Sequence, residues 1–167
     1  TITDTSDSAA DITSLDTKTS IVIGSSNITS LTGTFAEIQA AYTANTAGTI
    51  SGLGNEAATA SDTGSIAATA ITNLDAVTSG TVTVQGGITA LTGTIAEAQA
   101  AFDANDAGTI TGLDDSEAVT ASDTGSVVAT SITNLDAETT GVVAEASEKT
   151  LTGTFAEIQA AYTCLLY

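Results

Sequence analysis

Apolar side chains recur at helical spacing in a segment that the chain repeats. In residues 31–42 (Leu-Thr-Gly-Thr-Phe-Ala-Glu-Ile-Gln-Ala-Ala-Tyr), the positions of Phe35, Ile38 and Tyr42 place them on one face of a helix. Near-copies occupy residues 91–102 and 151–162, and the spacing is constant (91 − 31 = 60 and 151 − 91 = 60). A segment copied at a fixed period is typical of a repeat protein.

The polar positions of this segment predict where each helix begins and ends. Thr34 followed three residues later by Glu37 forms a capping box, in which the hydroxyl and the carboxylate each accept a hydrogen bond from a free N–H of the first turn. The other copies carry Thr94 with Glu97, and Thr154 with Glu157. Glycine suits the residue after a helix, and the first two copies have it at Gly48 and Gly108.

Between the repeated helices, polar and apolar residues alternate at period two, which predicts short strands. Residues 49–53 and 109–113 alternate alike, and residues 80–84 give a clear strand signal, with 141–143 as its weaker copy and 20–23 as its predecessor. Residues 57–62 and 118–123 are candidates for a second short strand in each unit. A second helix is expected from Ser65 to Leu74, with Ile66, Ala70, Ile71 and Leu74 facing inward, and its copy from Ser126 to Leu135.

Strands that alternate with helices at this spacing indicate parallel pairing through right-handed crossovers. We therefore expect an α/β repeat solenoid of about 30-residue strand–helix coils, in the style of leucine-rich repeats. A parallel β-helix with little helix is the alternative. In the solenoid, equivalent helix residues would stack in ladders, one of Phe35, Ile95 and Phe155 and one of Tyr42, Phe102 and Tyr162.

The repeats divide the chain into one partial and two full units, followed by a third that stops early. Residues 1–27 correspond to the second half of a unit, residues 28–87 form the first unit, residues 88–150 the second, and residues 151–167 a truncated third. All are expected to form one continuous solenoid. The end of the chain, Cys164 to Tyr167, departs from the repeat pattern.

Composition favours thin coils and an anionic surface. Hydrophobic residues make up 42% of the chain but aromatic residues only 4%, too few to fill a wide core. The net charge is −18, with Lys18 and Lys149 as the cations. Nucleic acid and anionic membranes are poor partners for such a field, because binding them requires Lys and Arg. No apolar run of about 18 residues predicts a membrane span.

The sequence offers little catalytic chemistry. Histidine, the usual acid–base group at neutral pH, is absent, and Cys164 is the single cysteine. Phosphate-binding glycine motifs are also absent. The best carboxylate pair, Asp114 and Asp115, falls where the first unit has Gly54 and Asn55. We expect no enzymatic activity.

The acidic residues between 103 and 117 are the candidate metal site. Only oxygen ligands are available, which favours calcium or magnesium; the loop at 103–108 resembles a calcium loop in part. The candidate ligands are Asp103, Asn105, Asp106, Asp114, Asp115 and Glu117. The ligand order of an EF-hand is not met, because Asp106 stands one place too early, so a solvated acidic loop is the alternative.

Three segments of the chain carry a resemblance to known proteins. The Leu-Thr-Gly-Thr-x-Ala-Glu-x-x-Ala-Ala-Tyr segment, the Gly-Leu-Gly-Asn-Glu-Ala run at 52–57 and the Ile-Thr-Asn-Leu-Asp segments resemble tandem repeats of very large extracellular or cell-surface proteins of marine bacteria and cyanobacteria. The resemblance implies a structural or adhesive segment of an exported protein, located outside the cell or on its surface. A calcium-dependent binding module is the alternative function. Expected partners are neighbouring repeats of a longer chain, or a second copy through the solenoid ends.

Overall fold

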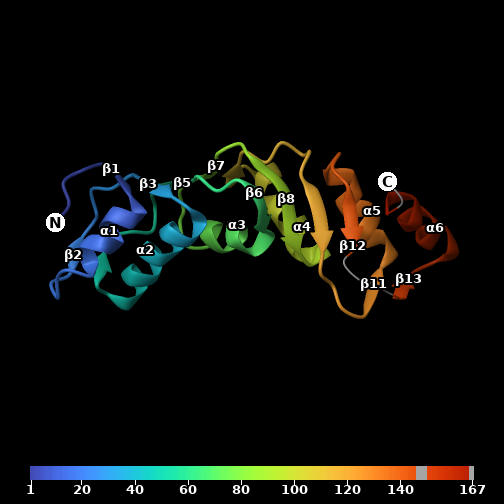
Figure 1. The fold of residues 1–167 in the computed structure, drawn as a ribbon, viewed down its shortest axis with the longest axis horizontal. Coiled ribbons are helices and arrows are strands. Elements are labelled where there is room, and N and C mark those ends of the chain that lie inside the picture. Colours follow the sequence, from blue (N-terminus) through green and yellow to red (C-terminus); the bar gives the residue numbers. More distant parts are fainter. Residues whose placement is uncertain (146–149, 166–167) are drawn as a thin grey trace.

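The computed structural model describes residues 1–145 and 150–165 of an elongated molecule, with α1 at one end of its long axis and α6 at the other (Figure 1). Lys149 and the last two residues of the tail, Leu166 and Tyr167, lie outside the described residues. The elements follow in the order β1 (Ser6–Ser8), α1 (Ala9–Asp16), β2 (Ile23–Gly24), β3 (Ser30–Gly33), α2 (Phe35–Ala47), β4 (Ile50–Ser51), β5 (Ala57–Ala60), β6 (Gly64–Ala67), α3 (Ala68–Asp75), β7 (Val82–Val84), β8 (Ile88–Gly93), α4 (Ile95–Ala107), β9 (Ile110–Thr111), β10 (Ala118–Ala121), β11 (Ser126–Val128), α5 (Ala129–Glu138), β12 (Val143–Glu145), β13 (Thr150–Thr152) and α6 (Phe155–Cys164).

The strands form parallel sheets and alternate with the helices, which confirms the α/β class. One sheet has the order β1-β3-β5-β7-β9 and another the order β12-β10-β8-β6, while β11 pairs with β13 and β2 with β4. Paired residues lie 24 to 28 positions apart, from Ser6 with Ser30 to Val82 with Ile110, which is shorter than the expected 30. The helices set this fold apart from the alternative of a β-helix with little helix.

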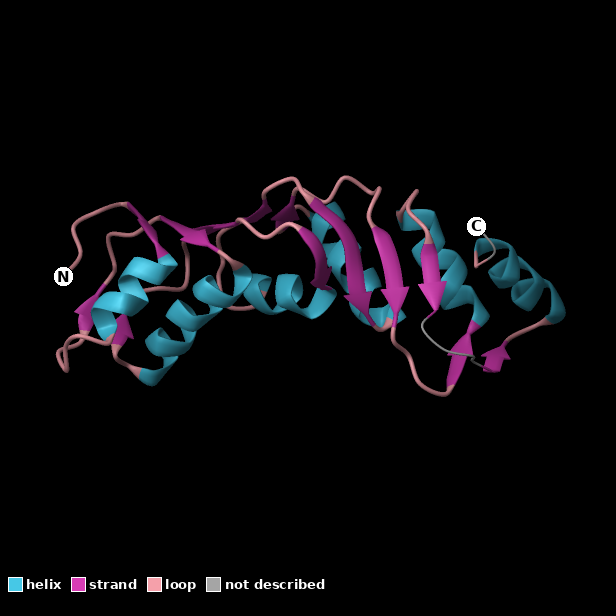
Figure 2. Cartoon of the chain, in the orientation of Figure 1, coloured by secondary structure: helices cyan, strands magenta, loops and turns pink. Residues whose placement is uncertain are grey.

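The helices follow one another along the molecule, with the strands beside them (Figure 2). Each helix contacts the next, from α1 with α2 to α5 with α6. The core between helices and strands is thin, as the composition predicts, and is closed by aliphatic and small residues. Those fully buried include Ile12, Leu31, Ile38, Ala58, Ile71, Leu91, Ala101, Ile132 and Leu135.

The capping boxes are confirmed in all three copies. At α2, the Glu37 backbone N–H donates to the Thr34 hydroxyl oxygen at 3.2 Å, and the Thr34 N–H donates to the Glu37 carboxylate at 2.8 Å. These bonds hold the pKa of Glu37 below its usual value. Gly48, at φ 83°, ends α2 in the left-handed conformation that glycine adopts most readily.

A second cap comes from much further along the chain. The carboxylate of Asp62 accepts a hydrogen bond from the Phe35 N–H at 2.7 Å, and Asp123 does the same for the Ile95 N–H at 2.8 Å. A carboxylate at this position also interacts favourably with the positive end of the helix dipole. The segment that follows each of these two helices therefore returns to cap it.

The expected strands are present, with shorter or shifted bounds, but the second helix begins later than predicted. The prediction of helix from Ser65 is wrong, because Ser65, Ile66 and Ala67 belong to β6 and pair with β8. The same holds for residues 126–128, which form β11 and pair with β13. Pairing with a neighbouring strand outweighs the local helical pattern at these positions.

The expected aromatic ladders do not form directly between copies. In the series of helix contacts, α3 lies between the helices that carry Phe35 and Ile95, and α5 lies between those that carry Ile95 and Phe155.

The unit boundaries are not domain boundaries, because β1 pairs with β3, β6 with β8, and β11 with β13 across them. Of the helices in residues 1–145 and 150–165, none has the length and apolar character that crossing a membrane requires.

Candidate functional site

The acidic residues predicted to bind calcium lie on three different parts of the chain. Asp103, Asn105 and Asp106 belong to the second half of α4, Asp114 and Asp115 to the loop after β9, and Glu117 to the start of the following strand region. Glu117 is 2% exposed, whereas Asp103, Asp106, Asp114 and Asp115 are exposed. Within the described part of the chain, no three acidic or cysteine side chains come together in a way that could hold a metal ion.

Two of the exposed carboxylates of this region, those of Asp103 and Asp114, have partners within the protein. The Asp103 Oδ1 accepts a hydrogen bond from the Gln99 amide at 2.9 Å. The Asp114 Oδ1 accepts from the Ser116 hydroxyl at 2.5 Å and from the Ser116 N–H at 3.1 Å, and these bonds lower the pKa of Asp114. Asp115 has a positive φ of 59°, and its carbonyl oxygen accepts from the Thr140 N–H at 2.7 Å. The contacts of Asp114 and Asp115 hold the loop after β9 in place, and the contact of Asp103 lies within α4.

Buried glutamates lie at equivalent positions of the two full units, and they are the buried carboxylates of the described residues. Glu56 is 0% exposed and Glu117 is 2% exposed. The Glu56 Oε2 accepts hydrogen bonds from the Gly54 N–H at 2.7 Å and the Asn55 N–H at 3.2 Å. The Glu117 Oε1 accepts from the Asp114 N–H at 3.0 Å. Each carboxylate therefore closes the turn that precedes it.

The backbone of each buried glutamate is held by a threonine and approached by a glycine. The Thr78 hydroxyl donates to the Glu56 carbonyl oxygen at 2.6 Å and accepts from the Gly80 N–H at 3.0 Å. Thr139 and Gly141 make the same contacts with Glu117. A side chain at Gly80 would overlap the Glu56 carbonyl group, so the close approach requires glycine. We call Glu56, Thr78 and Gly80, with their copies Glu117, Thr139 and Gly141, the glutamate clamps.

The carboxylate of the first glutamate clamp has a tyrosine hydroxyl as a partner, which the second clamp lacks. The Tyr42 hydroxyl donates to the Glu56 Oε2 at 3.1 Å, whereas the second unit has Phe102 at the equivalent position. Burial raises the pKa of Tyr42 to about 12, and the negative charge of Glu56 acts in the same direction. One oxygen of each glutamate, Oε1 of Glu56 and Oε2 of Glu117, is buried with no hydrogen-bond partner. The partners of the other oxygen of each glutamate are N–H and O–H donors, which favour an ionised carboxylate.

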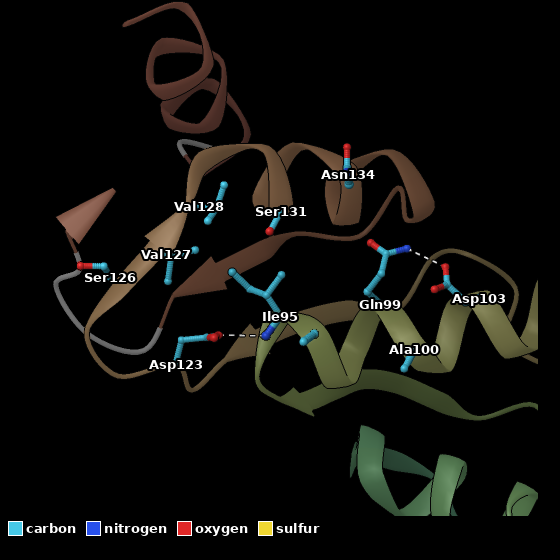
Figure 3. Close-up of a pocket in the computed structure, with 11 residues that line it drawn as sticks. Ile95, Gln99, Ala100, Asp103, Asp123, Ser126, Val127, Val128, Ser131 and Asn134 are labelled. Carbon is cyan, nitrogen blue, oxygen red and sulfur yellow. Dashed lines mark hydrogen bonds between the residues drawn. The ribbon is translucent and has the colours of Figure 1, made fainter. Parts of the chain in front are cut away.

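A groove runs between α4 and the segment β11–α5, and it contains one of the predicted metal ligands (Figure 3). Ile95 and Val127 form its apolar wall, and Gln99, Asp103, Asp123 and Ser131 are among its polar residues. Asp123 is turned toward the N-terminus of α4, and Gln99 toward Asp103. The first unit has an equivalent groove lined by Phe35, Gln39, Asp62, Ile66 and Ala70. The grooves therefore mark where successive helices meet.

Cys164 has the properties of an unreactive thiol. It lies half-buried in α6, and burial raises its pKa to about 11, with the carboxylate of Asp136 acting in the same direction. The thiolate is the nucleophilic form of cysteine, so a raised pKa leaves little of it at neutral pH.

Comparisons of this chain with protein-family models, with curated proteins and with solved structures found no match. What the molecule can do is therefore inferred from its own geometry. The sequence pattern places Glu117 among the candidate metal ligands and does not single out Glu56 as a buried carboxylate. The signal that could have paired them is the recurrence of a glutamate at the same place in both units, each followed by a threonine and then a glycine two residues beyond it (Thr78 and Gly80, Thr139 and Gly141).

Proposed function

We propose that this chain is a structural or adhesive repeat segment of an exported surface protein, and that it performs no catalysis. The observation that carries the proposal is the way the most strongly repeated residues are used. Thr34 and Glu37 cap a helix, Leu31 and Leu91 fill the core, and the glutamate clamps close turns. Residues that recur because the fold needs them are typical of a scaffold.

The arrangement of the elements supports an α/β solenoid. Strand pairs cross every unit boundary, each helix contacts the next, and α1 and α6 lie at opposite ends of the long axis (Figure 1). In a solenoid each coil contacts mainly its neighbours, so adding units lengthens the molecule without changing its cross-section. Such a molecule separates whatever lies at its two ends by a distance set by the number of units.

The charge supports a location outside the cell or on its surface. A net charge of −18 keeps an array soluble but makes its units repel one another. Salt reduces this repulsion to a range of about 8 Å at physiological ionic strength. We therefore propose a salty extracellular medium, neighbouring repeats as partners, and neither nucleic acid nor membrane lipid as ligand. Antibodies against the chain should label intact cells of the source organism; labelling only after permeabilisation would contradict the proposed location.

Changing the number of units tests the solenoid. Leu31 and Leu91 occupy equivalent positions, so deleting residues 31–90 joins Ser30 to Leu91 in phase, and duplicating residues 31–90 adds one unit in phase. We expect the maximum dimension from small-angle X-ray scattering to fall and rise by equal steps, with unchanged helix content per residue. A maximum dimension that stays constant would refute the proposal. The matched control deletes residues 31–75, which is out of phase, and should lose cooperative unfolding.

A further inference from the structure

Two helices that begin with the same nine residues differ in how far their aromatic side chains are exposed. Residues 31–43 and 151–163 are the same in every position, and they form β3–α2 and β13–α6 with the same capping box. Phe35 is 4% exposed, but its copy Phe155 is 85% exposed. Tyr42 is 3% exposed, but its copy Tyr162 is 54% exposed. The apolar face of α6 is therefore uncovered where the same face of α2 is closed.

The segment from β5 to α3 covers α2, and three contacts define how. The strand β5 pairs with β3 in parallel, with Leu31 beside Ala58. The Asp62 carboxylate accepts the Phe35 N–H at 2.7 Å. Ile66 and Ala70 line the groove beside Phe35, on the side where α3 packs against α2.

The second unit repeats this arrangement with a different sequence at the contact. The segment from β10 to α5 covers α4: β10 pairs with β8, and Asp123 accepts the Ile95 N–H at 2.8 Å. At the contact, Ile95 corresponds to Phe35 of the first unit, and Val127 beside it corresponds to Ile66. Since both helices are covered in the same way, the covering pattern is strand, aspartate, strand and helix, with an apolar residue over the first residue of the covered helix.

We propose that the exposed face of α6, together with β13, is a docking surface for a strand–helix segment of this pattern. The first strand of the docked segment pairs with β13, and its aspartate accepts a hydrogen bond from the Phe155 N–H. Its helix lies against Phe155 and Tyr162. The proposal rests on the proposed function, because the occupant is a further repeat segment. Its chemistry is that of residues 57–75 and 118–135, and the uncovered apolar area of α6 drives the association.

The N-terminal segment of a second copy is a poorer occupant. Helix α1 is the counterpart of α3, since Ile12 and Leu15 correspond to Ile71 and Leu74. At the covering positions, however, Asp7 and Asp11 stand where the first unit has Ile66 and Ala70. Placing these carboxylates against Phe155 would remove them from water without a partner. Two chains of net charge −18 also repel each other.

Adding a segment with the covering pattern after α6 tests the proposal. In the extended chain, the sequence of residues 44–78 follows Thr163 in place of residues 164–167, just as Ala44 follows Thr43. We expect amide hydrogen exchange of Phe155 to slow at least tenfold. We also expect Phe155→Asp to lower the melting temperature of the extended chain by several degrees and that of the original chain by less than one. The matched control is an extension whose copies of Asp62 and Ile66 are replaced by Ala and Asp; it should restore fast exchange.

Two results would overturn the proposal. The first is unchanged exchange at Phe155 in an extended chain whose added helix is visible by circular dichroism. The second is concentration-dependent protection of α6 in the original chain that Asp7→Ala strengthens, because this would identify a second copy as the occupant. Both are distinct from failure of the proposed function, since the deletion and duplication of residues 31–90 change the interior units and leave α6 as it is.

Discussion

Exchanging the single hydroxyl that distinguishes the two glutamate clamps tests whether the buried carboxylates are held by hydrogen bonds. Tyr42→Phe gives the first clamp the composition of the second, and Phe102→Tyr gives the second the composition of the first. Both positions are buried, at 3% and 1% exposure. Each exchange adds or removes a single oxygen atom, so neither creates a large cavity. Phe155→Tyr makes the same chemical change at an exposed position and is the matched control.

The two exchanges should shift stability in opposite directions. Tyr42→Phe removes the 3.1 Å hydrogen bond to the Glu56 Oε2, which keeps the Gly54 and Asn55 N–H groups as donors. A hydrogen bond to a buried charged group contributes about 1.5–3 kcal/mol, and the length of this one favours the lower value. Phe102→Tyr offers the Glu117 carboxylate the donor that Tyr42 gives to Glu56, and should stabilise by about 1 kcal/mol. For a chain of this length, 1 kcal/mol corresponds to roughly 2–4 °C in melting temperature.

The pH dependence gives an independent readout of the same hydroxyl. Burial raises the pKa of Tyr42 to about 12, above its ordinary value of about 10. The folded state therefore holds this proton more tightly than the unfolded state, so the stabilisation is complete below pH 10 and is lost as the pH rises through 12. Two pH units correspond to at most about 3 kcal/mol. The advantage of the parent chain over Tyr42→Phe should shrink between pH 10 and pH 12 and stay constant from pH 7 to pH 10.

Thermal and urea unfolding of the parent and the three variants, followed by circular dichroism, would measure these differences. The reasoning fails if Tyr42→Phe leaves the melting temperature unchanged, or if Phe102→Tyr lowers it, because the added hydroxyl would then be buried without a partner. A change of similar size in Phe155→Tyr would show that the effect does not depend on burial next to a glutamate.

Three further predictions concern the backbone, the caps and the acidic surface. Gly80→Ala should destabilise by more than 2 kcal/mol in urea unfolding, since its methyl group would overlap the Glu56 carbonyl, whereas Gly86→Ala, with open space around it, should stay within about 0.5 kcal/mol. Thr34→Ala should cost about 1 kcal/mol in the same assay through loss of the helix cap, and Thr34→Ser should retain most of that stability. Calcium and magnesium at equal millimolar concentration should raise the melting temperature equally, because both screen the net charge of −18. A larger shift with calcium that Asp114→Asn abolishes would instead support the calcium-binding module.

Features that depend on residues a few positions apart could be predicted from the sequence. The capping boxes join residues three positions apart, Gly48 supplies a conformation that few other residues adopt, and alternation within a few residues predicts β5 and β7. Leu113 follows Leu53 by 60 positions (113 − 53) and Glu117 follows Glu56 by 61 (117 − 56), which places the extra residue of the second unit in the loop at Asp114 to Ser116. These features follow from backbone geometry and local hydrogen bonds, which the sequence specifies directly.

Features that depend on distant residues were not predictable in this way. Residues 65–67 have a helical pattern but pair as a strand with β8, and the burial of Glu117 depends on folding, which brings the Thr139 hydroxyl to its carbonyl oxygen. The caps from Asp62 and Asp123 join residues 27 and 28 positions apart. In each case a partner brought close by folding outweighs the local preference.

The repeated segment separates the two contributions most clearly. The sequence by itself determined that residues 31–43 and 151–163 form a capped helix with an apolar face, because identical residues have identical local preferences. Whether that face is closed was decided only by the tertiary structure. Phe35 is buried because a segment from further along the chain packs on it, and Phe155, with the same neighbours in sequence, is exposed to solvent.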